Sequence, residues 1–105
     1  MQSDPVVSII ILTWNSKAYL TTCLNKLLMQ TFQDFQVIVV DNASTDSSAA
    51  VLPKQFPGVQ FIWLKENLGF GKANNLAMEK ARGEYFLVLN PDTLIPEHFF
   101  KQFLE

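Results

Sequence analysis

Residues Phe35 to Asp46 read FQVIVVDNASTD, an almost wholly apolar run that changes at once into a polar one. Apolar residues on both faces are typical of strands in a parallel sheet that is covered on both sides. Asp, Asn, Ser and Thr favour the positions that begin helices, so the polar half suits the turn that leaves such a strand. This stretch therefore predicts a strand at Phe35–Val40 within an α/β fold.

Three further apolar runs resemble that strand, namely Val6–Leu12, Val59–Leu64 and Tyr85–Leu89. The segments between them are too long for hairpins and have helical spacing. The first connection carries its apolar residues on one helix face, which Asn15 or Ser16 would cap: these are Leu20, Cys23, Leu24, Leu27 and Leu28. The alternation of strands and helices predicts a doubly wound, mostly parallel sheet in three layers.

The remaining connections also predict helices. The second runs from Asp46 to Phe56, where Pro53 should shorten or kink it, and the third runs from Gly69 to Arg82. Gly83 stands where a left-handed residue commonly ends a helix. A last helix would open at Pro96 and carry Phe99, Phe100, Phe103 and Leu104 on one face.

The composition of the 105 residues indicates a globular domain, with 49% hydrophobic and 17% charged residues. A net charge of −2 and the lack of a basic stripe argue against a nucleic-acid partner. No apolar run approaches the ~20 residues of a membrane helix. The single cysteine, Cys23, excludes an internal disulfide and suits a reducing compartment.

Ligands of open parallel α/β sheets bind outside the carboxyl ends of the strands, so the four polar turns there are the candidate site. Helix capping alone would explain each turn taken singly. The turn after the first strand has no glycine, and no GxxxxGK[ST] motif is present, so two common phosphate-binding loops are excluded. Asp41 could instead accept hydrogen bonds from a base or ribose, and Asp92 could hold a divalent cation on a pyrophosphate.

Four motifs in this order resemble family 2 glycosyltransferases with the GT-A fold. They are TWNS at 13–16, VVDNASTD at 39–46, ENLGFGKANN at 66–75 and LNPD at 89–92. The resemblance extends over nearly the whole chain and implies strand order 3-2-1-4. It also implies a nucleotide-sugar donor site.

In that site Thr13 and Asn15 would line the nucleoside pocket and Asp41 would hydrogen-bond the base. Asn67 and Gly69 would close over the nucleotide, with Asn75 near the diphosphate or sugar. Asp92 matches the last position of the family's DxD motif and would bind Mg²⁺ or Mn²⁺, with Asn90 as a second candidate ligand. Because Asn90 replaces an acidic residue, metal dependence is an open question. The NPD sequence is similar to rhamnosyltransferase-like members, which favours a UDP- or dTDP-sugar donor.

Inverting transfer needs a general base, which the resemblance places beyond Glu105, together with the acceptor site. We therefore expect residues 1–105 to be the donor-binding segment of a longer enzyme in bacterial cell-surface polysaccharide or glycan synthesis, inactive alone. Its location would be cytoplasmic, with peripheral attachment to the inner face of the membrane. The alternative is a non-catalytic nucleotide-binding or assembly module with an exposed face at Phe99, Phe100 and Phe103. Uncovered apolar surface would favour a homodimer of the segment.

Other conspicuous side chains have ordinary structural interpretations. We expect Asp46 to be a helix cap rather than a ligand. Trp14 could stack on a base, but we expect it to be packed. Asn74 would satisfy nearby backbone, Cys23 would lie in the core, and His98 would lie on the surface.

Overall fold

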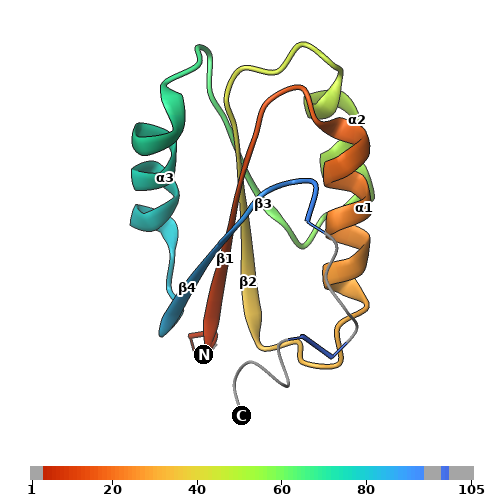
Figure 1. Cartoon of the computed structure of the whole chain (residues 1–105), viewed down its shortest axis with the longest axis vertical. Helices are drawn as coiled ribbons and strands as arrows, with labels where there is room; N and C mark the ends of the chain where they lie inside the picture. Colours follow the sequence, from red (N-terminus) through yellow and green to blue (C-terminus); the bar gives the residue numbers. More distant parts are fainter. Residues whose placement is uncertain (1–3, 94–97, 100–105) are drawn as a thin grey trace.

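The computed structural model describes residues 4–93 and 98–99, and Figure 1 shows the arrangement of their helices and strands. The elements in chain order are β1 (Val7–Thr13), α1 (Lys17–Leu28), β2 (Phe35–Asp41), α2 (Ser48–Gln55), β3 (Gln60–Trp63), α3 (Gly69–Lys80) and β4 (Tyr85–Leu89). The four predicted strands are confirmed, although β3 is shorter at both ends than its apolar run.

All strand pairs in the described sheet are parallel, in the order β3-β2-β1-β4. The strand β1 is central, pairing Thr13 with Asp41 of β2 and Ile11 with Leu89 of β4. Helices α1 and α2 lie on one side of the sheet and α3 on the other (Figure 1). The predicted three-layer, doubly wound fold and its strand order are therefore confirmed.

Alternate residues of β1 feed two separate cores, as the period of two in a strand requires. Ile9 and Ile11 pack in the core beneath α1 and α2, which contains Leu24 and Leu52. Ile10 packs in the core beneath α3, which consists of Leu12, Ile38, Val40, Ala73 and Ala77. Since burial of one such aliphatic side chain contributes ~1.5–3 kcal/mol, the doubly buried strand accounts for much of the fold's stability.

The start of α1 differs from the predicted caps. Ser16 is the residue before α1, but its hydroxyl donates to the backbone carbonyl of Trp14. The Lys17 amide donates instead to Asp46 Oδ2 at 3.0 Å, from the other loop. Helix α2 begins at Ser48 and contains Pro53 two residues before its end at Gln55. The helix is thus shorter than the predicted segment from Asp46 to Phe56, and Pro53 lies near its end.

The left-handed conformation expected of Gly83 is wrong, because Gly69 is the described glycine with positive φ. Helix α3 ends at Lys80, and Ala81 already has extended backbone. At Gly83 a Cβ would lie 2.4 Å from the Ser8 amide nitrogen and 2.7 Å from the Val7 carbonyl carbon. Glycine is required there because the chain passes directly against β1.

The predicted helix from Pro96 to Leu104 falls largely outside the described residues, as do Phe100 and Phe103. Phe99 is partly buried against the core beneath α1 and α2, so the exposed face expected at this residue is wrong. Within the described chain, none of the helices combines the length and apolar character needed to cross a bilayer.

Candidate functional site

The loops after β1 and β2 are joined by side-chain hydrogen bonds at the carboxyl ends of the strands. The amide of Asn15 donates to Ser44 Oγ at 2.8 Å, and Asn15 Oδ1 accepts from the Thr45 amide at 2.7 Å. The Asn42 amide donates to the Thr13 carbonyl at 2.9 Å. The structure thus brings together Thr13, Asn15 and the turn that begins at Asp41.

The loop after β3 is attached to the same group. Asn42 Oδ1 accepts from the Leu68 amide at 3.2 Å, and Asn67 Oδ1 accepts from the Gly69 amide at 2.8 Å. Gly69 has φ of +80°, a conformation in which glycine has no Cβ penalty. We call the residues Thr13, Asn15, Asp41, Asn67 and Gly69 the strand-end cluster.

Backbone strain is concentrated in this region. Among the described residues other than glycine, positive φ occurs at Asn15 (49°), Ala43 (64°) and Ser47 (70°), all in the loops after β1 and β2. Such conformations each cost ~1–3 kcal/mol and tend to gather where a protein binds or reacts. The hydrogen bonds between the two loops hold these residues in place.

Asp41 is the deepest carboxylate of the strand-end cluster, with 3% of its surface exposed. Its Oδ2 accepts from the Ser44 amide at 2.8 Å, whereas its buried Oδ1 has no hydrogen-bond partner. Burying a carboxylate oxygen without a hydrogen-bond partner lowers the stability of the fold. A hydrogen-bond donor on a ligand is one explanation for such an oxygen. This geometry makes Asp41 able to accept a hydrogen bond from a ligand.

Helix α3 supplies a second buried oxygen of this kind. Asn74 Oδ1 also has no partner, so the expectation that it satisfies nearby backbone is wrong for this atom. The neighbouring Asn75 is exposed on α3, and no described contact joins it to the strand-end cluster. The role predicted for Asn75 stays a prediction.

Asp92 and Asn90 lie in a separate cavity between the start of α1 and the end of β4. The cavity has a volume of about 360 Å³ and is lined by Ser16, Tyr19, Asn90, Pro91 and Asp92. The Thr93 amide donates to the Asn90 carbonyl at 3.1 Å, which closes the turn that carries Asp92. We call this space the Asp92 cavity; Ser16 connects it through the chain to Asn15 of the strand-end cluster.

Asp92 is also close enough to α1 to affect Cys23. Burial raises the pKa of the Cys23 thiol to about 11, and the negative charge of Asp92 adds to the increase. Cys23 is fully buried, so its predicted place in the core is confirmed. A thiol with this pKa stays protonated at neutral pH and is a poor nucleophile.

The donor atoms of the Asp92 cavity fit a hard divalent cation. One carboxylate and one side-chain amide offer oxygen ligands, and Mg²⁺ commonly takes one or two protein carboxylates while phosphate and water complete its shell. In the described part of the chain, no group of three or more His, Cys, Asp or Glu side chains could hold a metal alone. A cation here would therefore need phosphate oxygens from a ligand.

Asp46 acts as a helix cap, as predicted, and it serves two helices. Besides the Lys17 amide at the start of α1, it accepts from the amide and hydroxyl of Ser48 at the start of α2. Partial burial acts to raise its pKa, but the hydrogen bonds from Ser48 and Lys17 outweigh this and lower it. Asp46 therefore stays ionised at neutral pH and joins the two loops.

Two aromatic side chains near the strand ends are exposed, and only Trp14 was considered from the sequence, as a packed residue or a base-stacking one. Trp14 is 57% exposed, so the expectation that it is packed is wrong, and Tyr19 is 64% exposed. The signal for Tyr19 in the sequence is that it lies beside the buried stripe of Leu20 and Cys23 rather than in it. His98 is exposed and contacts Thr31 at 3.1 Å, so its surface position is confirmed.

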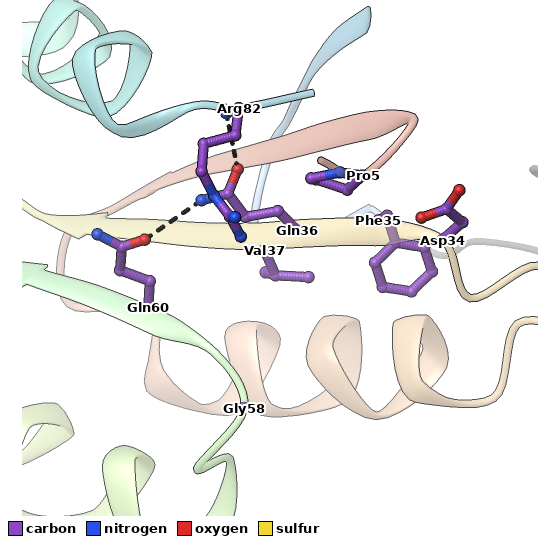
Figure 2. A pocket seen from close by; sticks show the side chains of 8 residues that line it. All are labelled: Pro5, Asp34, Phe35, Gln36, Val37, Gly58, Gln60 and Arg82. Carbon is purple, nitrogen blue, oxygen red and sulfur yellow. Dashed lines mark hydrogen bonds between the residues drawn. The ribbon is translucent and has the colours of Figure 1, made fainter. Parts of the chain in front are cut away.

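The other end of the sheet has a different character. An open pocket of about 270 Å³ lies there, between the start of β2 and Arg82, and Figure 2 shows the side chains that line it. Gln36 occupies its centre and donates to Gln60 Oε1 at 3.3 Å and to the Lys80 carbonyl at 3.1 Å. Its Oε1 accepts from the Arg82 amide and from Ser8 Oγ, so this side chain ties three strands to the end of α3.

A parallel, doubly wound sheet with polar loops gathered at the carboxyl ends of its strands defines a nucleotide-binding α/β protein of the Rossmann-like kind. The chain belongs to glycosyl transferase family 2, whose family model matches residues 8–105. The resemblance seen in the sequence motifs is thereby confirmed.

Solved structures of family relatives share the fold closely. The chain is similar to Staphylococcus aureus TarS 1–349 in complex with UDP, at 33% identity and a TM-score of 0.84, covering 93% of this chain and 30% of that one. TarS 1–349 in complex with UDP-GlcNAc gives the same TM-score of 0.84. The mannosyltransferase PcManGT from Pyrobaculum calidifontis, in complex with GDP-Man and Mn²⁺, matches 90% of this chain and 30% of its own at 26% identity and a TM-score of 0.76.

Among curated relatives, the chain is 32% identical over 103 residues to a teichoic acid poly(glycerol phosphate) polymerase of Staphylococcus epidermidis. That match covers 94% of this chain and 14% of the polymerase. A poly(ribitol-phosphate) beta-N-acetylglucosaminyltransferase of S. aureus, TarS, is 35% identical over 99 residues, which are 90% of this chain and 17% of that protein. The chain thus spans a small part of these relatives.

Proposed function

We propose that the chain is the donor-binding part of an inverting glycosyltransferase that uses a nucleoside-diphosphate sugar. The observation that carries this proposal is the buried, unpartnered Oδ1 of Asp41 at the carboxyl end of β2. A base N–H would satisfy this oxygen, while Oδ2 keeps its bond to the Ser44 amide. Oδ1 is buried, so contact with a base would require a small displacement of the loops around it.

The other members of the strand-end cluster would surround the nucleoside. Thr13 ends β1 beside Asp41 at the end of β2, and Asn15 lies in the loop after β1. The loop of Asn67 and Gly69 is tied to them through Asn42. Trp14, exposed beside Asn15, offers a flat apolar face against which a base could stack. Asn75 is proposed to approach the diphosphate or sugar from α3.

Asp92, with Asn90 as second ligand, would hold Mg²⁺ or Mn²⁺ on the diphosphate. The Mn²⁺ in the related mannosyltransferase structure supports a divalent cation in this family. A bound cation would offset the negative charge that develops on the leaving nucleoside diphosphate. The chain's own contribution is to fix the carboxylate through the turn closed by Thr93 and Asn90.

The carboxylate that would deprotonate the acceptor is proposed to lie outside this chain. The Asp92 cavity contains one carboxylate, that of Asp92, which the cation would occupy. Residues 1–105 would then bind donor without transferring sugar. The acceptor site and the rest of the transferase would come from further protein. Residues 1–105 alone could form a homodimer, which would bury apolar surface that this further protein would otherwise cover.

UDP is the donor nucleotide that the TarS complexes favour, with a dTDP-sugar as the second candidate. The teichoic acid polymerase and TarS relatives support a role in bacterial cell-surface polysaccharide synthesis. The proposed location is cytoplasmic, at the inner face of the membrane. The buried, reduced Cys23 suits that compartment.

Isothermal titration calorimetry of the chain with UDP, dTDP and GDP, each with Mg²⁺ or Mn²⁺, tests donor binding. We expect the chain to bind one of the three nucleoside diphosphates in preference to the other two. An assay with the corresponding radiolabelled nucleotide sugar should show no transfer. Absence of binding to all three would contradict the donor site, and transfer by this chain alone would contradict the proposed need for further protein.

A further inference from the structure

The Asp92 cavity contains an aromatic side chain whose position the fold does not explain. Tyr19 is 64% exposed in the first turn of α1, whereas Leu20 and Cys23 of the same helix are almost fully buried. Isolated exposed aromatic residues are common on protein surfaces. Tyr19 differs from such a residue because it forms a wall of a cavity of about 360 Å³ that also contains Asp92.

The lining of this cavity matches the chemistry of a sugar ring. A pyranose presents C–H groups on its faces and hydroxyl groups at its edge, so it suits a flat aromatic side chain together with carboxylate and amide oxygens. Tyr19 provides the aromatic face and Ser16 provides a hydroxyl group, while Asp92 and Asn90 are the groups assigned above to the cation. The lining includes no Lys or Arg, so the charge of the diphosphate would be balanced by the cation, and the neutral sugar would contact the rest of the lining directly.

The place of Tyr19 in the fold agrees with the order of groups in a nucleotide sugar. The strand-end cluster would hold the base, and Asp92 would lie at the diphosphate. Tyr19 and Asp92 line the same cavity, and Tyr19 lies in the helix that follows Asn15 of the strand-end cluster and Ser16. The group that follows the diphosphate in the donor is its sugar.

The helix turn that carries Tyr19 is held firmly before any ligand binds. The Lys17 amide is fixed by Asp46 Oδ2 at 3.0 Å, and the Leu20 amide donates to the Ser16 carbonyl at 2.8 Å. The backbone at Tyr19 is therefore fixed in advance, so any ordering on binding concerns the side chain alone.

We propose that Tyr19 is a specificity-determining residue whose ring packs against the sugar of the donor in the Asp92 cavity. The inference rests on the proposed function, since it takes the ligand to be a nucleotide sugar. It assigns to α1 a contact with the transferred sugar, separate from the contacts of the strand-end cluster with the nucleotide.

Calorimetric titrations of the chain with UDP and with UDP-GlcNAc test this, using wild type, Tyr19→Ala and Tyr19→Phe. We expect Tyr19→Ala to weaken UDP-GlcNAc binding about three- to tenfold and UDP binding less than about twofold. Tyr19→Phe, which keeps the ring, should bind both within about twofold of wild type. Tyr85→Ala is the matched control, because Tyr85 is similarly exposed, at 54%, but lies at the start of β4.

The outcomes separate the inference from the function on which it rests. If wild type binds both ligands and Tyr19→Ala binds both as wild type does, the role of Tyr19 is wrong and the donor site stands. If Tyr19→Ala loses affinity for UDP and for UDP-GlcNAc by the same factor, the proposed role of Tyr19 is also wrong, because that pattern indicates a general disturbance of α1. If wild type binds neither these ligands nor the GDP and GDP-mannose pair, the proposed function and the inference both fail.

Discussion

The two ends of the sheet both carry polar side chains, but they differ in whether the buried polar atoms have hydrogen-bond partners. At the amino ends of the strands, both polar atoms of the Gln36 side chain are hydrogen-bonded to neighbouring segments (Figure 2). At the carboxyl ends, Asp41 keeps one oxygen buried and unpaired. The three non-glycine residues with positive φ in the described chain also lie in the carboxyl-end loops.

This difference shows where the fold is stabilised and where it is prepared for a ligand. A buried polar group that is fully satisfied fixes neighbouring elements in one arrangement. Strained backbone and an unsatisfied carboxylate cost stability and persist where binding compensates for them. Substitutions at the amino end should therefore affect unfolding, and those at Asp41 should affect binding.

The largest expected effect is at the amino end, for Gly83→Ala. The added Cβ would meet the Ser8 amide nitrogen at 2.4 Å and the Val7 carbonyl carbon at 2.7 Å, so β1 would have to move. We expect a loss of about 3 kcal/mol in the free energy of unfolding, measured by urea denaturation. Gly58→Ala is the control, because no atom lies within 4 Å of its Cβ position, and it should change stability by less than about 0.5 kcal/mol. Equal stability of the two variants would refute the close approach.

A smaller loss is expected for Asp46→Ala, which removes the cap shared by α1 and α2. Each lost cap costs about 1 kcal/mol, so the free energy of unfolding should fall by about 2 kcal/mol. The exposed Asp34, in the loop before β2, gives the control Asp34→Ala, with little expected change. A loss no larger than that of the control would show that the two-helix cap contributes nothing.

The pH dependence of stability follows from the same carboxylate. The pKa of Asp46 is lowered from 3.8 by its hydrogen bonds, so the folded state binds this proton less readily than the unfolded state. Its contribution is present above the unfolded value and is lost as pH falls through the folded value. In urea denaturation measured between about pH 5 and pH 2, the free energy of unfolding should fall more steeply with decreasing pH for wild type than for Asp46→Asn. Parallel curves would contradict this.

The smallest change in stability, and one of opposite sign, is expected for Asp41→Asn. In this variant the amide oxygen can keep the bond from the Ser44 amide and the NH2 group takes the place of the unpaired oxygen, so a buried charge is removed although a polar group stays unpaired. We expect the free energy of unfolding to rise by about 1 kcal/mol in the absence of ligand. A clear decrease would mean that the carboxylate stabilises the fold, which would remove the contrast between the two ends.

The sequence was sufficient for the fold because its strands are apolar on both faces and its helices have one apolar stripe. Ile9 to Leu12 can be buried on alternate sides only in a sheet with helices on both faces. Gly83 was misassigned because a left-handed helix end and a close approach to a neighbouring strand both favour glycine. Only the packing of β1 against residue 83 distinguishes them.

The candidate site was predictable in part for a similar reason. The rule that ligands bind at the carboxyl ends of parallel strands located Asp41 and Asp92 before the structure was known. The pairing of Asn15 with Ser44 and Thr45, and the double cap by Asp46, join residues about 30 positions apart, which no local pattern reveals. Tyr19 was missed because its significance depends on the cavity that it shares with Asp92.

The central claim is that the unpaired oxygen of Asp41 binds the donor nucleotide. The most direct measurement is the calorimetric affinity for UDP of wild type, Asp41→Asn and the charge-matched control Asp34→Asn. We predict that wild type and Asp34→Asn bind UDP equally and that Asp41→Asn binds at least about tenfold more weakly while remaining folded. Equal affinity of Asp41→Asn and wild type would contradict the account.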